Sequence, residues 1–118
     1  NVFVGPFVEI TKGVKIGHNT KISSHSFLCE LVEIGESCFI SHGVMFTNDL
    51  FKSGKLGGGI KNWHSTSIGN NVIIGSNATI LPIKICDGCV IGAGSVVTKD
   101  LKIKGIYAGN PAKLFRKL

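Results

Sequence analysis

A six-residue repeat of large apolar side chains runs through most of this 118-residue chain. Every sixth residue from Val4 to Phe46 is large and apolar, and the spacing resumes from Ile68 to Val97 with one interval of five. An α-helix repeats every 3.6 residues and a simple strand every two, so neither element explains the pattern. The repeat consists of Val4, Ile10, Ile16, Ile22, Leu28, Ile34, Ile40, Phe46, Ile68, Ile74, Ile80, Ile85, Ile91 and Val97.

A period of six has one simple physical solution. Small side chains occupy most positions four residues after each large one, and glycine or a small polar residue often follows it directly. Each hexapeptide can therefore form one short strand and one tight turn. Three hexapeptides close a triangular coil, and the coils stack about 4.8 Å apart. The sequence predicts an all-β prism of four to five coils. Lys84 breaks the small-residue rule, which we attribute to the missing residue between Ile80 and Ile85.

The repeat also accounts for the four cysteines. Cys38 and Cys89 fall in small inward positions, and Cys29 and Cys86 fall at turns. Cys86 and Cys89 form one C-x-x-C, but no second pair or histidine pair stands at zinc spacing. We therefore predict no metal site, and reduced thiols fit a cytoplasmic protein.

Two segments depart from the repeat. Residues 49–67 contain a glycine-rich stretch, and the spacing across them is not a multiple of six. We interpret them as a loop outside the prism, either functional or a tolerated insertion. Residues 101–118 also lose the period. Asn110-Pro111-Ala112-Lys113 predicts a turn, and the five residues that follow predict a short helix that caps the open end.

Composition limits the classes of protein and ligand that remain. Hydrophobic residues make up 43% of the chain, charged residues only 17%, and the formal net charge is +6. No apolar run approaches the roughly 20 residues of a membrane span, and the start does not predict a signal peptide. Nucleic-acid motifs are absent, so a phosphate-rich small molecule is the better anion. We interpret residues 1–118 as one domain. The sequence starts at Asn1, already inside a repeat, so a fragment of a longer protein is one interpretation of it.

The repeat, with Ile91-Gly92-Ala93-Gly94-Ser95-Val96-Val97-Thr98-Lys99-Asp100 and then Ala108-Gly109-Asn110-Pro111-Ala112-Lys113, resembles the hexapeptide acyltransferase family. The segment Gly43-Val44-Met45-Phe46-Thr47-Asn48-Asp49 before a loop looks like the branch that N-acetylates nucleotide-linked amino sugars, of the 3-amino-3,6-dideoxyhexose or 3-amino-uronate type, in cell-surface glycan and lipopolysaccharide synthesis. The resemblance implies a left-handed parallel β-helix, acetyl-CoA as co-substrate and a homotrimer with sites between neighbouring prisms. Many relatives carry more coils or an N-terminal domain.

Amine acetylation needs a proton acceptor, and four histidines are available. Counted on an 18-residue coil, His25 and His42 lie on one face of adjacent coils, and Glu30 stacks with Asn48. We expect these four around one corner, immediately before the loop, with His18 on the third face. His42 is the leading candidate for the base and His25 the second, with Glu30 or Asn48 orienting the base or the sugar. The CoA sulfur as proton acceptor stays open.

The remaining candidates bind ligands. Asp49, Trp63 and His64 are expected to contact the acceptor from the loop. The resemblance implies a pantetheine arm along the prism, bonded around Ser76, Ala93 and Gly94. Cations near the C-terminus are expected to meet the CoA phosphates: Lys99, Lys113 and Arg116.

Three other functions are known for prisms of this kind or for this chemistry. A trimeric zinc carbonic anhydrase on the same prism needs two histidines five residues apart, and no two histidines here have that spacing. A non-catalytic β-helix scaffold would favour regular threonine ladders without a loop, but the threonines are scattered. Within the acyltransferases, another acceptor stays open, such as serine, a galactoside hydroxyl or an antibiotic.

Overall fold

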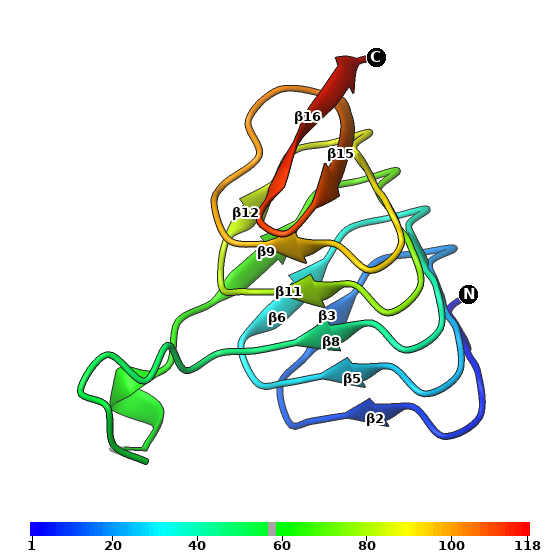
Figure 1. Cartoon of the computed structure of the whole chain (residues 1–118). Coiled ribbons are helices and arrows are strands. Elements are labelled where there is room, and N and C mark those ends of the chain that lie inside the picture. The colour runs from blue at the N-terminus through cyan, green and yellow to red at the C-terminus, as the bar shows by residue number, and fades with distance from the viewer. Residues whose placement is uncertain (57–58) are drawn as a thin grey trace.

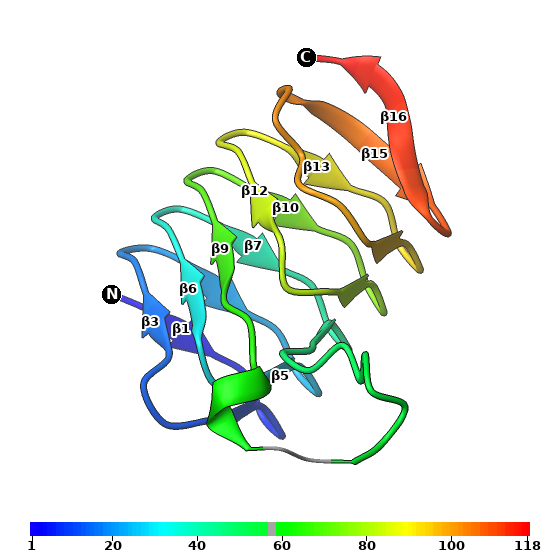
Figure 2. The same ribbon diagram turned by 90° about the vertical axis from the view of Figure 1, so that its left-hand side faces the viewer.

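The computed structural model describes residues 1–56 and 59–118 and shows a triangular prism of stacked coils (Figure 1). Each coil contributes a short strand to the sheets on the sides of the prism, and Figure 2 shows the coils stacked in chain order. The fold is the left-handed parallel β-helix that the resemblance implies. One sheet holds five strands and another holds six parallel strands before its last, antiparallel one, so the prism has about six turns, more than the four to five predicted.

The strands form three sheets, here called A, B and C. Sheet A contains β1 (Phe3–Val4), β4 (Lys21–Ile22), β7 (Phe39–Ile40), β10 (Ile73–Ile74), β13 (Val90–Ile91), β15 (Gly105–Gly109) and β16 (Ala112–Lys117). Sheet B contains β2 (Glu9–Ile10), β5 (Phe27–Leu28), β8 (Met45–Phe46), β11 (Thr79–Ile80) and β14 (Val96–Val97). Sheet C contains β3 (Lys15–Ile16), β6 (Val32–Ile34), β9 (Thr66–Ile68) and β12 (Lys84–Ile85).

The large residues of the repeat fill the prism as predicted. In sheet A, Ile22 pairs with Ile40, Ile40 with Ile74, and Ile74 with Ile91. All four side chains are at most 1% exposed, and burying each contributes roughly 1.5–3 kcal/mol. At the first coil the inward residue Val4 remains 44% exposed, because no coil of the described residues lies beneath it.

The five-residue interval is absorbed without a change of register. Ile85 still pairs with Ile68, so β12 lies directly on β9. Lys84 points outward and is exposed, while Ile83 is only 8% exposed and takes the inward position before it. The chain therefore keeps its coil-to-coil stacking with one residue fewer. This agrees with the attribution of the Lys84 irregularity to the missing residue.

The cysteines are packed as predicted. Cys29, Cys38 and Cys89 are buried, Cys86 is half-buried, and all four are free. The Cys86 and Cys89 sulfur atoms lie 3.4 Å apart. Within residues 1–56 and 59–118, no three histidine, cysteine, aspartate or glutamate side chains gather as a metal-binding group. No helix in the same part of the chain is long and apolar enough to cross a membrane.

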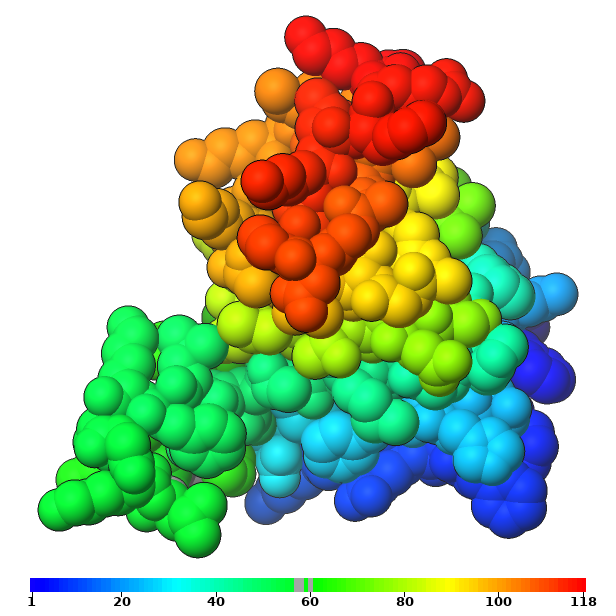
Figure 3. All heavy atoms as spheres, viewed as in Figure 1, coloured from blue at the N-terminus to red at the C-terminus, as the bar shows by residue number. Residues whose placement is uncertain are grey.

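The loop leaves the prism after β8 and returns at β9, as predicted, and it stands out as the green projection in Figures 1 and 3. The loop ends at Ser65 rather than at Ser67, because Thr66 and Ser67 already pair with Val32 and Glu33 of β6. The returning arm contains a 3-10 helix, η1 (Ile60–Asn62). The glycine-rich stretch that marked the loop includes residues 57–58, which lie outside the described residues.

The predicted C-terminal helix is wrong. β15 continues sheet A parallel to β13, and β16 turns back antiparallel along β15. The outer edge of β15 offers these residues backbone partners that five residues of isolated helix cannot supply, since so short a helix leaves most of its own donors and acceptors unpaired. Buried Tyr107 secures the hairpin by donating a hydrogen bond to the Ile103 carbonyl at 2.6 Å.

Candidate active site

The turns between strands stack into three edges along the prism. The A–B edge, between sheets A and B, consists of residues 5–7, 23–25, 41–43, 75–77 and 92–94. The B–C edge consists of residues 11–13, 29–31, 47–49, 81–82 and 98–100. His18 lies on the third edge, where its carbonyl accepts a hydrogen bond from Ser37, and so is apart from the other candidates as predicted.

The four candidate polar residues do not gather around one corner, as the sequence had led us to expect. His25 and His42 lie on the A–B edge, whereas Glu30 and Asn48 lie on the B–C edge. The width of sheet B separates the two pairs. Asn48 does stack on Glu30, but its side-chain amide donates to the Glu30 backbone carbonyl at 3.3 Å rather than to the carboxylate.

His42 has a polar side-chain partner on the A–B edge. Its side chain is exposed, and its Nδ1 lies 3.2 Å from the Ser76 hydroxyl oxygen. The Asn77 N–H donates to the His42 carbonyl at 3.0 Å, which fixes the two turns in register. If Nδ1–H donates to Ser76, the Nε2 lone pair is free toward solvent and can accept a proton. The structure thus joins the predicted base to a predicted cofactor-binding residue.

His25 occupies a different row of the same edge. The residue stacked above it is Gly43 rather than His42, because the Gly43 N–H donates to Ser24 and the His25 N–H donates to Pro6. The His25 ring stacks on Phe7, with centroids 5.1 Å apart and 27° between the planes. Its backbone has a positive φ of 63°. The imidazole is therefore engaged toward the first coil.

The A–B edge continues past Ser76 to the other predicted cofactor residues. Gly94 donates its N–H to the Ser76 carbonyl at 2.8 Å, and both Ala93 and Gly94 are exposed. Lys113 pairs with Ala108 in the terminal hairpin, and a Cβ placed on Gly92 would lie 3.2 Å from the Ala108 Cβ. Lys113 thus lies near the far end of this edge.

Two other predicted cations lie elsewhere. Lys99 is exposed on the B–C edge, and Arg116 is exposed on β16 opposite Ile106. Neither shares the A–B edge with Ser76.

The loop is anchored beside the B–C edge. His64 donates its N–H to the Asn48 carbonyl at 2.8 Å, and Asp49 forms an antiparallel bridge with half-buried Trp63. Beyond this anchor the two arms enclose a hollow of about 260 Å³. Asp49 and His64 contribute to its wall, but Trp63 does not.

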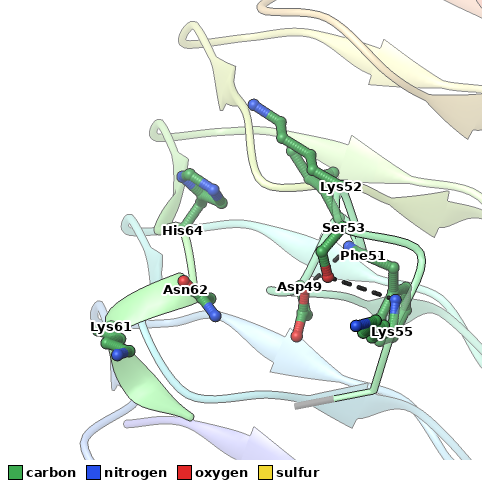
Figure 4. Close-up of a pocket in the computed structure, with 9 residues that line it drawn as sticks. Asp49, Phe51, Lys52, Ser53, Lys55, Lys61, Asn62 and His64 are labelled. Atoms are coloured by element: carbon green, nitrogen blue, oxygen red, sulfur yellow. Dashed lines mark hydrogen bonds between the residues drawn. The ribbon is translucent and has the colours of Figure 1, made fainter. Parts of the chain in front are cut away.

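Sequence reasoning missed the basic side chains around this hollow. Figure 4 shows Lys61 and Asn62 on the returning arm across from Asp49, Ser53 and Lys55 on the leaving arm. Lys52 extends away from the Asp49 carboxylate in the same view. Three lysines within ten residues of one loop were the available signal.

A thiol nucleophile is disfavoured. Burial raises the pKa of Cys29 and Cys89 to about 11 and also raises that of Cys38. These sulfurs are therefore protonated at neutral pH, and a protonated thiol is a poor nucleophile.

Comparison with known proteins agrees with this fold. Residues 65–99 match the family model for the hexapeptide repeat of succinyl-transferase. The chain is 34% identical over 117 residues to the bifunctional protein GlmU of Streptococcus uberis, a match that covers 98% of this chain and 23% of that protein. The chain thus spans about a quarter of the length of this curated relative.

Solved structures resemble the whole prism. A maltose O-acetyltransferase from Clostridium difficile 630 matches with a TM-score of 0.86 and 25% identity, covering 100% of this chain and 67% of that one. A galactoside acetyltransferase in complex with coenzyme A matches with a TM-score of 0.82 and 29% identity, covering 98% and 64%. The repeat, the prism and these matches make the chain similar to hexapeptide-repeat acyltransferases. Both solved relatives are acetyltransferases.

The close stacking of the A–B edge predicts a severe effect of Gly75→Ala. The added Cβ would lie 2.5 Å from the Ala93 nitrogen and 2.8 Å from the Gly92 carbonyl carbon. Because the coils cannot separate without losing hydrogen bonds, we expect a loss of about 3 kcal/mol in the free energy of unfolding. Urea denaturation measures it.

Gly13→Ala is the matched control. Gly13 has a φ of +82° and open space around its Cβ position, so alanine there costs only about 1 kcal/mol of backbone strain. Equal losses in the two variants would contradict the close stacking of residues 75 and 93.

Proposed function

We propose that the chain is an N-acetyltransferase that moves an acetyl group from acetyl-CoA to the amine of a nucleotide-linked amino sugar. The observation that carries the proposal is the His42–Ser76 pair, 3.2 Å apart on an exposed edge of a β-helix whose solved relatives are acetyltransferases. The coenzyme A complex of the galactoside acetyltransferase supports acetyl-CoA as the donor.

The A–B edge fits an extended, amide-rich arm such as pantetheine. It presents the Ser76 hydroxyl and the exposed backbone of Ala93 and Gly94 in one line, with Lys113 near the far end for phosphate oxygens. Arg116 lies on the same strand as Lys113. Lys99 lies on the B–C edge, so a neighbouring prism supplies it more readily.

His42 then acts as the base. As the amine nitrogen bonds to the acetyl carbon, His42 Nε2 accepts the amine proton, the carbon–sulfur bond breaks, and the proton passes to the leaving sulfur. Ser76 holds Nδ1 and so fixes the ring orientation and tautomer. His25, stacked on Phe7, is assigned a supporting contact rather than the proton transfer.

The acceptor is proposed to approach from the loop side. Glu30, Asn48 and Asp49 lie where the loop joins the B–C edge, and Trp63 and His64 begin its returning arm. Polar groups here suit sugar hydroxyls, and in the proposed trimer the amine reaches the His42 of a neighbouring prism rather than the His42 one sheet-width away in the same chain. The nucleotide-linked amino sugar itself rests on the sequence resemblance around Gly43–Asp49.

The acceptor class is tested with a panel. Acetyl-CoA is supplied with UDP- and dTDP-linked 3-amino sugars, maltose, a galactoside and serine, and products are measured by mass spectrometry. We expect the nucleotide-linked amines to exceed the others in kcat/KM by at least about 10²-fold. Preference for maltose or the galactoside would show that the proposed acceptor is wrong but would agree with acetyltransferase activity. No acetylated product from any acceptor would contradict both the acceptor and the activity.

Histidine and serine variants test the mechanism. His42→Ala should lower kcat by about 10²–10⁴-fold with little change in the KM for acetyl-CoA. Ser76→Ala should lower kcat by roughly tenfold, because the imidazole remains but its orientation is lost, and Ser76→Thr should restore it. His25→Ala is the matched control and should retain most activity. If His42→Ala loses less than tenfold, the CoA sulfur rather than His42 accepts the proton.

A homotrimer is proposed because one outward face of the prism is unusually apolar. The outward row of sheet A includes Phe3, Phe39 and Ile73, which are 57%, 41% and 45% exposed. The outward row of sheet C is polar, with Lys15 and Glu33 forming an ion pair at 3.5 Å. Free, reduced thiols also favour the cytoplasm as the place of action.

Light scattering tests the assembly. We expect a mass of three chains for the wild type and a smaller species for Ile73→Glu, because a carboxylate would be desolvated at the interface. Lys84→Glu, on the outward side of sheet C, should leave the trimer intact. A monomeric wild type at micromolar concentration would exclude the trimer.

A further inference from the structure

The hollow between the two arms of the loop is held in shape by backbone contacts. Asp49 pairs with Trp63 at its base, the Phe51 N–H donates to the Asp49 carboxylate at 2.8 Å, and the Lys55 N–H donates to the Ser53 hydroxyl at 3.3 Å. Its volume of about 260 Å³ lies just below the range of about 300–1,000 Å³ for complete small-molecule sites. It therefore suits one part of a larger ligand.

The wall of the hollow is basic. Lys52, Lys55 and Lys61 line it against one carboxylate, Asp49, so the lining carries a formal charge of 3 − 1 = +2. That carboxylate already accepts the Phe51 N–H. Throughout residues 1–56 and 59–118 the ion pair is Lys15–Glu33, so the three loop ammonium groups have no carboxylate partner there. Unpaired ammonium groups around a concavity favour an anion, and lysine is a common phosphate ligand.

An aromatic ring stands in the same wall. Phe51 is 55% exposed, and its backbone adopts a φ of 50°, a conformation uncommon for a bulky side chain. An exposed phenyl ring beside cations offers a stacking surface for a planar base, and such stacking tolerates any base. Phosphate-binding cations and a base-stacking ring together match a nucleotide.

We propose that this hollow, lined by Phe51, Lys52, Lys55 and Lys61, binds the nucleoside diphosphate portion of the acceptor. The inference rests on the acceptor class proposed above and gives that acceptor a handle separate from its reacting amine. The diphosphate lies among the lysines, the base lies on Phe51, and the sugar extends toward the B–C edge, where the loop is anchored at Asn48.

Calorimetric titration of the full chain with UDP tests the proposal. UDP should bind more tightly than pyrophosphate or uridine alone, and added NaCl should weaken it through screening. Lys52→Gln/Lys55→Gln/Lys61→Gln should weaken UDP and pyrophosphate by about tenfold or more. Phe51→Ala should weaken UDP while leaving pyrophosphate unchanged, because only the base loses its stacking partner.

The matched control is Lys84→Gln/Lys102→Gln/Lys104→Gln, which removes the same charge from exposed sites outside the hollow. It should bind UDP like the wild type. Equal weakening in both triple variants would reduce the effect to net charge and overturn the proposal, as would unchanged UDP binding in the loop variant.

Coenzyme A also carries a nucleoside diphosphate, so competition between coenzyme A and UDP distinguishes a donor site from an acceptor site. If coenzyme A displaces UDP and the loop variant raises the KM for acetyl-CoA rather than for the acceptor, the hollow serves the donor and the proposal is wrong. If UDP binds in the hollow but no nucleotide-linked amine is acetylated, the acceptor assignment fails and the nucleotide site stands. If the loop variant acetylates such amines as well as the wild type does, the acceptor assignment stands and the hollow does not bind the nucleotide of the acceptor.

Discussion

Hydrogen bonds between successive coils are the constraint on which the rest of this protein depends. Phe39 donates to the Val72 carbonyl and Ile73 to the Cys89 carbonyl, each bond joining one coil to the next. Because these bonds fix the distance between coils, every coil must place its large apolar residue above the last. The chain satisfies this across the loop between β8 and β9 and across an interval one residue short. Both irregularities are confined to turns.

The repeat predicted most of the fold because packing depends on each residue's position within the coil. The inward isoleucines, the buried cysteines and the external loop all followed from counting. The C-terminal helix was mispredicted because local composition does not reveal that β15 leaves a free edge to be paired. The loop boundary was two residues off for the same reason, since pairing with β6 decides where β9 begins.

The candidate site was harder to predict than the core. Spacing gives the position of a residue along a coil, but His42 and Asn48 are six residues apart, which is one third of a coil and therefore another edge. The pairing of His42 with Ser76 could have been predicted from the sequence. Their separation of 34 residues equals one coil of 18 plus the 16 residues that the loop adds, the same separation as between paired Ile40 and Ile74. Removing the inserted residues before counting would have placed the two side chains together.

The prism and the loop impose different physical limits on function. On an edge, neighbouring turns are fixed by backbone hydrogen bonds, so a histidine and a serine one coil apart meet at a set distance with little entropy left to lose. That suits proton transfer, which depends on orientation. The loop is anchored to the B–C edge at Asn48, Asp49 and Trp63, and beyond that anchor its length and charge are free of the coil spacing. Recognition of a large anionic acceptor can therefore change there without disturbing the stack. The proposed function places the chemistry on the rigid edge and the selectivity on the inserted segment, a division that fits this architecture because a substitution at Gly75 must move a coil whereas a substitution at Lys55 moves only a side chain in solvent.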